Sequence, residues 1–326
     1  MGRRARFRLS DTAIGFLLAI LGSISFGAYI LPRKLSQLSV LEYQYWLAIV
    51  IAPFCIVVAL VAGASLAMPP TMLGLSILCG VIWTFGSLSY SSAVDHVGVT
   101  RSTPIKNMAP VFAAIYGIII FQEYSLANPV ALGMAVSGVL LMVAAAFLIG
   151  RASAQEHEKA FAYDVTRSKV DRRRSFGLGI AFSLAAAFFY GAYSAPLKYL
   201  FKKGISVYAV CAWLGVGVLV TTLLIYIVKE RRLAPSFPGR REFLLAQGAG
   251  AIWTSGQLLG ALAMLYIPMS ISWPVSNLGT LVAVAWGVYI FKEVHIEKHV
   301  KEFALGLVLY LVGLTLLAMA APGGHV

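Results

Sequence analysis

Charged residues are scarce in this chain of 326 residues: they make up 12% of the sequence, against 60% hydrophobic residues. A soluble globular domain has about 25% charged and about 45–50% apolar residues. The mean hydropathy of +0.83 therefore reflects more apolar side chains than an aqueous core would bury. Composition excludes an ordinary soluble protein and indicates that lipid is the solvent.

Residues that would form a catalytic or metal centre are also few. The three cysteines (Cys55, Cys79 and Cys211) lie inside apolar runs, as small core residues do, and no Cys/His ligand spacing accompanies them. The sequence has no phosphate-binding G-x-x-x-x-G-K-[ST] run, no G-x-S-x-G motif and no paired carboxylates. We therefore expect neither an enzyme nor a metal or cofactor site.

Basic residues outnumber acidic ones, 26 to 13, which gives a net charge of +13. They occur in short clusters between apolar runs and form no long basic face, so they indicate helix orientation in a membrane and not nucleic-acid binding. Residues 1–9 carry four arginines before an apolar run. That run is too long for a signal peptide and no small-residue cleavage site follows it, so we expect a retained first helix.

Ten apolar runs are long enough to cross a bilayer, which needs roughly twenty apolar residues per helix. The runs are Thr12–Leu31, Glu42–Ala62, Met72–Ala93, Pro104–Phe121, Pro129–Ile149, Gly177–Leu197, Val207–Val228, Phe243–Met264, Ser270–Phe291 and Phe303–Ala320. The predicted fold class is an all-α polytopic membrane protein with ten transmembrane helices.

The two halves of the chain repeat one another. The same pattern of Gly, Ala, Tyr, Pro and Lys ends the first and sixth runs, at residues 27–34 and 191–198. Residues 80–123 match residues 250–293 without gaps at fifteen of forty-four positions, with Trp, Pro, Asn and Glu in register. Chance similarity between apolar segments would match Leu, Val and Ala instead, so we interpret the pattern as an internal repeat.

Each half holds five runs, an odd number, so the second half would enter the membrane from the opposite side, as two inverted five-helix repeats. The predicted domains are a first repeat at 1–150, a charged linker at 151–175 and the inverted repeat at 176–326. The charged segment either joins the halves or acts as a regulatory segment.

The distribution of Lys and Arg gives a divided prediction of sidedness. Ten spans place both termini on one side, and most basic residues lie in loops on the other, at 33–34, 151–174, 229–241 and 292–301. This favours both termini outside, whereas the arginines of residues 1–9 favour the reverse. Short loops in a small chain fit a bacterial inner membrane.

The motifs resemble those of a known transporter superfamily. The patterns G-x-I-W-T-x-G and G-x-x-I-F-x-E occur in both halves, from Gly80, Gly117, Gly250 and Gly287, and resemble the drug/metabolite transporter superfamily. Residues 97–105 are similar to the bacterial glucose/ribose porter family and, more distantly, to rhamnose–proton symporters. In the second half, residues 267–274 keep a small polar residue and the proline but lack the basic residue. The resemblance implies ten helices and sugar transport.

Two asparagines are the leading candidates for substrate contacts. Asn107 and Asn277 follow Pro104 and Pro274 by three residues, and we expect both prolines at or just inside helix starts. A buried amide either joins two helices or lines a cavity, where it can donate to and accept from sugar hydroxyls. Lys106 either reaches the membrane interface or faces that cavity.

Aromatic and amide side chains inside helices extend the candidate site. Trp83 and Trp253 lie several residues within their runs, where an indole either stacks on a sugar ring or packs against a helix. Tyr90 shares the helix face of Trp83, and Gln257 lies one turn after Trp253.

Residues near helix ends are candidates for gating or proton coupling. Tyr29 and Tyr193 are interpreted as interface anchors in preference to cavity residues. For each charged candidate, the competing explanation is a helix cap, loop packing or a solvated loop. No carboxylate lies deep inside a run, and this argues against proton symport. The charged candidates are Glu42, Asp95, His96, Glu123 and Glu293.

Taken together, these features favour a secondary carrier that moves a small polar solute, most simply a sugar, by alternating access. An exporter of a drug, amino acid or other metabolite on the same fold is the alternative, and a non-transporting sensor is a minor one. The expected partners are the substrate and the lipid bilayer. Small residues at Gly133, Ser137 and Gly138 allow close helix contact, either inside a monomer or in a homodimer.

Overall fold

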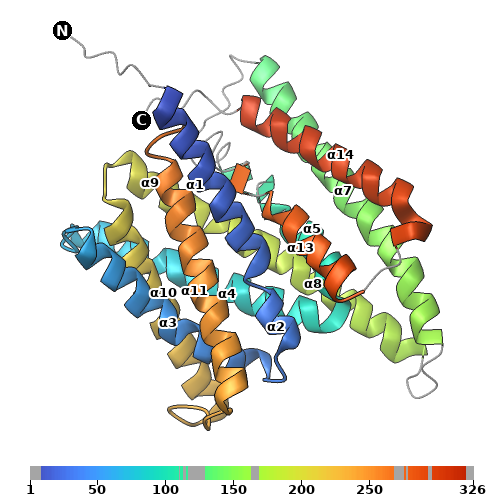
Figure 1. Cartoon of the computed structure of the whole chain (residues 1–326), viewed down its shortest axis with the longest axis horizontal. Coiled ribbons are helices and arrows are strands. Elements are labelled where there is room, and N and C mark those ends of the chain that lie inside the picture. Colours follow the sequence, from blue (N-terminus) through green and yellow to red (C-terminus); the bar gives the residue numbers. More distant parts are fainter. Residues whose placement is uncertain are drawn as a thin grey trace.

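The structure is a computed structural model that describes residues 9–109, 111–112, 115–116, 129–162, 169–267, 275–276, 278–292 and 296–320. Within these ranges all regular structure is helical, so the predicted all-α class is confirmed (Figure 1). The first helices are α1 (Leu9–Ala28), α2 (Leu31–Leu35), α3 (Val40–Val61), α4 (Pro70–Val97), α5 (Val99–Lys106) and α7 (Pro129–Ala162). They are followed by α8 (Lys169–Ala192), α9 (Ser194–Lys202), α10 (Val207–Glu230), α11 (Arg240–Ala263), α13 (Gly279–Ala285), the π-helical turn η1 (Trp286–Ile290) and α14 (Ile296–Ala320).

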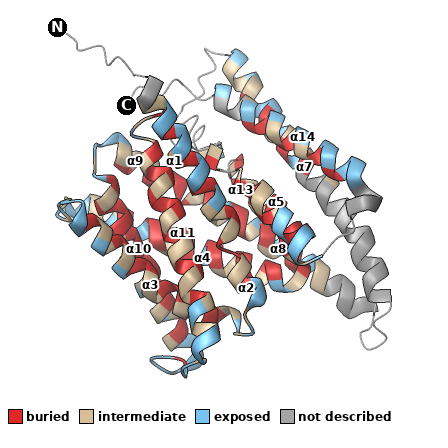
Figure 2. Cartoon of the chain, in the orientation of Figure 1, coloured by how far each residue is buried: buried red, intermediate tan, exposed pale blue. Residues whose placement is uncertain are grey.

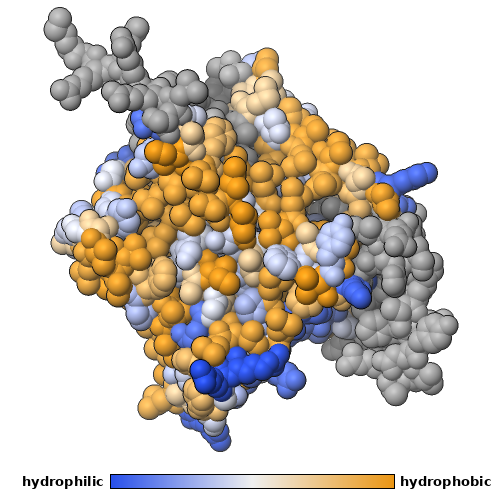
Figure 3. All heavy atoms as spheres, in the orientation of Figure 1, coloured by the Kyte–Doolittle hydropathy of each residue, from blue (hydrophilic) through white to orange (hydrophobic). Residues whose placement is uncertain are grey.

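Five helical stretches of the described residues are long and apolar enough to cross a bilayer. They correspond to the first, second, third, sixth and seventh predicted runs: Asp11–Leu35, Val40–Val61, Pro70–Val97, Ser175–Lys202 and Val207–Glu230. Large apolar side chains on their outer faces are exposed, such as Leu17, Leu60 and Leu224. Figure 3 shows a broad apolar surface, with hydrophilic atoms gathered mostly toward its edges. Lipid is the solvent that suits such a surface.

Local sequence signals set several helix ends. Ser39 and Glu42 form a reciprocal capping box that satisfies backbone donors at the start of α3. Pro70 occupies the first turn of α4, where its missing N–H costs nothing. Gly98 separates α4 from α5 with a φ of 81°, a conformation that residues with a Cβ rarely adopt.

Three of the predicted runs are interrupted. The first breaks after Ala28 and the sixth after Ala192, at the same point of the repeated Gly-Ala-Tyr pattern. In the fourth run, α5 begins at Val99 and ends at Lys106, so Pro104 lies inside this helix and not at its start. The expectation for Pro104 was wrong because Gly98 ends α4 and allows the new helix to begin five residues earlier.

The helices pack in a pattern that pairs elements from different parts of the chain. The contacts are between α1 and α11, α4 and α8, α3 and α11, α4 and α10, α1 and α13, and α5 and α8. Three further contacts also pair a helix of the first half with one of the second: α3 with α10, α5 with α13 and α7 with α14. Figure 2 shows the buried residues on the sides that face these neighbours.

The segment expected to be a linker is partly helical. Helix α7 continues through Arg151 to Ala162, and α8 begins at Lys169, before the predicted sixth run. Gly138 of α7 faces α14, where a Cβ on Gly313 would meet the Gly138 carbonyl oxygen at 2.7 Å, whereas Gly133 and Ser137 are exposed. Close packing inside the monomer therefore accounts for Gly138.

Candidate substrate site

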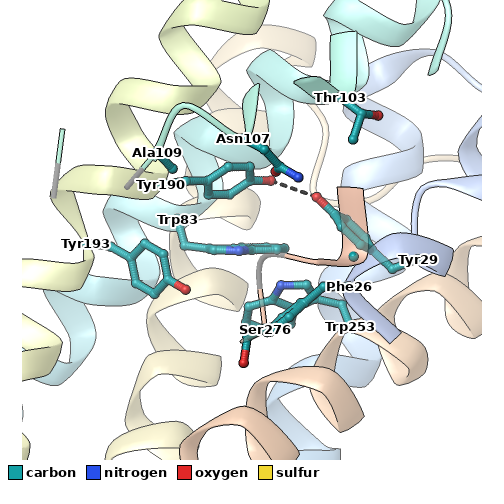
Figure 4. A pocket seen from close by; sticks show the side chains of 11 residues that line it. Phe26, Tyr29, Trp83, Thr103, Asn107, Ala109, Tyr190, Tyr193, Trp253 and Ser276 are labelled. Carbon is teal, nitrogen blue, oxygen red and sulfur yellow. Dashed lines mark hydrogen bonds between the residues drawn. The ribbon is translucent and has the colours of Figure 1, made fainter. Parts of the chain in front are cut away.

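A cavity lies where residues of α1, α4, α5, α8, α11 and α13 come together (Figure 4). The volume open to water-sized molecules is about 70 Å³. One water needs roughly 10–15 Å³ by this measure, so the cavity is a space for a small solute or several waters. Its lining residues are Phe26, Tyr29, Trp83, Thr103, Asn107, Ala109, Tyr190, Tyr193, Trp253, Ser276 and Gly279.

Two tryptophans form a wall of this cavity. The indoles of Trp83 and Trp253 lie against each other, with ring centroids 4.0 Å apart and an interplanar angle of 40°. Both side chains are almost fully buried. Packing and cavity lining therefore both apply to these residues, because each indole packs on the other and also lines the cavity.

Asn107 joins two helices and lines the cavity at once. It caps the C-terminal end of α5, and its side-chain amide donates a hydrogen bond to Thr280 Oγ1 on α13. The Thr280 hydroxyl in turn donates to the Tyr310 hydroxyl, 3.3 Å away. An amide held in this way presents its remaining hydrogen-bonding positions in a fixed direction. The predicted partners Asn277 and Pro274 lie outside the described residues.

Lys106 points inward. Its Nζ lies over the Tyr90 ring at 4.9 Å and over the Tyr190 ring at 5.5 Å, which is cation–π geometry. The Tyr90 hydroxyl is 2.6 Å from Thr103 Oγ1, and both oxygens can donate or accept. Lys106 and Tyr90 stand behind the cavity wall, since they contact the lining residues Tyr190 and Thr103 without lining it themselves.

Tyr29 and Tyr193 occupy positions that differ from the prediction. Both are buried and line the cavity, so the interpretation as interface anchors was wrong. The helix breaks after Ala28 and Ala192 turn these residues toward the interior. The Gly-Ala-Tyr pattern could have identified these two tyrosines as interior residues. It occurs in both halves, whereas an interface anchor does not need to recur at equivalent positions.

Four further cavity residues were not predicted from the sequence: Phe26, Thr103, Tyr190 and Ser276. The Ser276 hydroxyl is buried without a hydrogen-bond partner among the described residues. It also lines a second, smaller cavity together with Gln257. The Tyr193 hydroxyl lies 3.5 Å from Gln257 Oε1, at the long limit for a hydrogen bond. The predicted site residue Gln257 thus stands beside the main cavity, next to Phe26.

The charged candidates within the described residues are not cavity residues. Asp95 forms an ion pair with Arg33, His96 shares a hydrogen bond of 3.1 Å with Ser175, and Glu42 belongs to the capping box of α3. Glu123 and Glu293 lie outside the described residues.

Polar contacts hold α2 to helices from both halves of the chain, and we call them the α2 clamp: Arg33, Ser36, Asp95 and Glu242. Arg33 is almost fully buried, pairs with Asp95 and donates to the Leu38 carbonyl at 2.9 Å. Glu242, just before the predicted eighth run, accepts from Ser36 Oγ at 2.6 Å and from the Gln37 N–H at 3.0 Å. These hydrogen bonds hold the pKa of the Glu242 carboxyl below its usual range.

Helices of membrane-spanning length around a central cavity with aromatic and polar walls are typical of a membrane protein that binds a small solute. The family model for sugar transport proteins matches residues 17–320, and the chain belongs to this family, which is a family of transporters and not of enzymes. The resemblance to sugar-uptake proteins of the drug/metabolite transporter superfamily is thereby confirmed.

Curated relatives agree with this assignment. The chain is 21% identical to a probable glucose uptake protein of Bacillus cereus, over 78% of this chain and 81% of the relative. It is 20% identical to the glucose uptake protein of Bacillus subtilis, over 75% and 77%, and 23% identical to a putative sugar uptake protein of Lactiplantibacillus plantarum, over 73% and 76%. A solved crystal structure, 15% identical, aligns with a TM-score of 0.60 over 96% of this chain and 98% of that one, which shows a shared fold.

Proposed function

We propose that this protein is a secondary carrier that brings a sugar across a bacterial inner membrane by alternating access between two inverted halves. Glucose is the first candidate substrate. The cavity with paired residues from both halves is the observation that carries the proposal. Its features support a mechanism in which one central site is exposed to the two sides in turn.

The packing pattern supports the inverted halves. If α1 corresponds to α8, α3 to α10, α4 to α11 and α5 to α13, exchanging the halves turns the α1–α11 contact into the α8–α4 contact. The same exchange relates α3–α11 to α10–α4 and α1–α13 to α8–α5. The pairs α3–α10, α5–α13 and α7–α14 map onto themselves, as elements beside a two-fold axis would.

Close contacts between helices follow the same rule. A Cβ on Gly86 of α4 would meet the Tyr190 ring of α8 at 2.8 Å, and one on Gly256 of α11 would meet the Phe26 ring of α1 at 3.2 Å. Gly86 and Gly256 are repeat partners, and so are Tyr190 and Phe26 in the alignment of the first and sixth runs. The repeat therefore relates both members of each contact.

The chemistry of the cavity supports a neutral, hydroxylated substrate. Indole faces stack on the C–H faces of a sugar ring, while an amide and hydroxyl groups exchange hydrogen bonds with its hydroxyls. Among the described residues, the lining includes Trp83, Trp253, Asn107, Thr103 and Ser276 and no carboxylate. A carboxylate would favour cationic solutes, so this lining speaks against a cationic-drug exporter. The printed names of the relatives point to the same substrate class.

The test is uptake of labelled glucose, ribose and rhamnose by proteoliposomes of the purified protein, with and without an imposed proton gradient. We expect saturable uptake of one of these sugars, with loss of uptake in an Asn107→Ala/Asn277→Ala variant. Absence of uptake of every sugar by folded protein would reject the sugar assignment. A panel of amino acids and drugs would then test the exporter alternative.

A further inference from the structure

Two tyrosines from different halves meet at one edge of the cavity. The hydroxyl groups of Tyr29, after α1, and Tyr190, on α8, are 3.0 Å apart and hydrogen-bonded (Figure 4). Both side chains are at most 8% exposed, and both line the cavity. A buried hydroxyl needs a partner, so this bond is lost only if another partner replaces it.

The repeat relates this pair to a second pair that lacks the bond. When the alignment of the first and sixth runs is extended to residues 26–34 and 190–198, Tyr29 corresponds to Tyr193 and Phe26 corresponds to Tyr190. Phe26 and Tyr193 also line the cavity. Phenylalanine has no hydroxyl, so the equivalent hydrogen bond cannot form between Phe26 and Tyr193. The four aromatic rings therefore occupy equivalent positions in the two halves, but only one of the two pairs carries two hydroxyl groups.

The two pairs belong to opposite ends of the molecule. Tyr29 lies two residues before α2, and Tyr193 directly precedes α9, which lies at the far end in Figure 1. Phe26 lies one helical turn before Tyr29 on α1, and Tyr190 lies one helical turn before Tyr193 on α8. Because α1 runs toward α2 and α8 runs toward α9, the tyrosine pair lies closer to the α2 end than Phe26 and Tyr193 do.

Other contacts also make the α2 end more tightly held than the α9 end. The α2 clamp ties the α2 end to α4 and α11 through an ion pair and hydrogen bonds. Lys106 covers the Tyr190 ring. The second cavity lies on the other side, where it shares Phe26 and Ser276 with the main cavity. Closure is therefore reinforced at the α2 end, and extra space lies beside Phe26.

We propose that the Tyr29–Tyr190 hydroxyl pair is the gate of the carrier at its α2 end, and that Phe26 leaves the opposing gate without the equivalent hydrogen bond. This inference rests on the proposed alternation between inverted halves. Opening toward the α2 end requires the two hydroxyls to separate, and sugar hydroxyls in the cavity are the replacement partners that lower the cost of this step. The resting protein consequently favours the state closed at the α2 end.

Accessibility of the cavity from each side measures this bias without requiring sugar. The reporter is Ala109→Cys, at a lining position, in a background with Cys55, Cys79 and Cys211 replaced by serine. A membrane-impermeant maleimide is applied to intact cells and to inverted vesicles, and the two labelling rates are compared. A separate Gln37→Cys variant, at an exposed position of the α2–α3 loop, identifies which side belongs to the α2 end.

Removing a hydroxyl group at one gate and adding one at the other should change the labelling rates in opposite directions. Tyr29→Phe and Tyr190→Phe should each raise labelling from the α2 side about two- to tenfold, the equilibrium effect of one buried hydrogen bond. The double variant should give no further increase, because both substitutions remove the same bond. Phe26→Tyr, which supplies a hydroxyl at the other gate, should lower labelling from the α9 side by a similar factor.

A tyrosine outside the cavity serves as the control: Tyr199→Phe on α9 should leave both rates unchanged. The gate assignment fails if Tyr29→Phe and Tyr190→Phe leave the ratio of the rates unchanged, or if Tyr199→Phe shifts it equally. Sugar uptake by the reporter protein is measured separately. Absence of uptake with the predicted labelling shifts would reject the sugar assignment and keep the gate, whereas uptake without the shifts would reject the gate alone.

Discussion

Asn107 is the residue at which helix packing and substrate binding are hardest to separate, because its amide bonds Thr280 and also lines the cavity. Thr280→Val removes the partner and leaves the cavity lining intact. We expect Asn107→Ala to raise KM for sugar tenfold or more, and Thr280→Val to destabilise the protein by about 1 kcal/mol with a smaller effect on KM. Uptake kinetics and thermal unfolding of the two variants measure the difference. Equal KM values for both would assign Asn107 to packing alone.

The tryptophan pair makes a second prediction at this scale. If sugar stacks on the wall formed by Trp83 and Trp253, binding should change their fluorescence. Trp83→Phe and Trp253→Phe should each weaken sugar affinity by about 1 kcal/mol, roughly fivefold, because a smaller ring offers less stacking surface. Trp213→Phe is the control, since its indole N–H bonds the Leu66 carbonyl away from the cavity. A sugar titration in which Trp213→Phe behaves like the other two would contradict this placement.

The sequence predicted some individual site residues and not others for a physical reason. Trp83, Trp253 and Asn107 stood out because polar or large aromatic groups repeat in register inside apolar runs. Phe26 and Tyr190 did not, because they are ordinary apolar or aromatic residues in apolar runs and differ between the halves. Their role depends on the helix breaks three residues or fewer after them, and hydropathy does not detect a break of one turn.

Helix α4 contains two glycines that test how closely the elements must approach. A Cβ on Gly80 would meet the Leu214 carbonyl oxygen and the backbone of α10, whereas one on Gly74 would meet nothing within 4 Å. Gly80→Ala should therefore cost about 1–3 kcal/mol through forced separation of α4 and α10. Gly74→Ala should be neutral or stabilising by up to about 1 kcal/mol, because alanine favours helix. Thermal unfolding in detergent distinguishes them, and equal effects would show that α4 and α10 do not need this contact.

The α2 clamp predicts an acid-sensitive element. The pKa of Glu242 is lowered in the folded protein, so its hydrogen bonds stabilise the fold above the unfolded pKa, about 4.3, and this contribution is lost as pH falls through the folded pKa. Thermal unfolding should show Glu242→Gln less stable than the natural chain at neutral pH, with the difference shrinking as pH falls below about 4. A difference that stays constant with pH would rule out the carboxylate as its source.

Element boundaries were predictable where hydropathy changes sharply, as for α10, and where a capping box adds to it, as for α3. The predicted starts of the fourth and sixth runs were wrong or late for a different reason. At Gly98 a single left-handed glycine divides α4 from α5, and at Lys169 a charged helix begins before the apolar stretch. Hydropathy marks where lipid surrounds a helix, and a helix can begin earlier than that.

At the scale of the whole molecule, the internal repeat was the most informative feature of the sequence. It predicted which helices should occupy equivalent places, and the exchange-related packing pairs support that correspondence. It did not reveal that the cavity would combine matched pairs, such as Trp83 with Trp253, and unmatched pairs, such as Tyr190 with Phe26. Matching residues build the shape of the site, while the unmatched residues can give its two ends different properties.

Counterflow tests the central claim, carriage by alternating access, most directly. Proteoliposomes are loaded with a high concentration of unlabelled glucose and diluted into a trace of labelled glucose. A carrier that exposes one site to the two sides in turn should accumulate label transiently above its equilibrium level, because each outward passage returns a labelled molecule inward, and Asn107→Ala/Asn277→Ala should abolish the overshoot. A monotonic rise to equilibrium would indicate an open pore, and no protein-dependent entry of label would exclude glucose as the substrate.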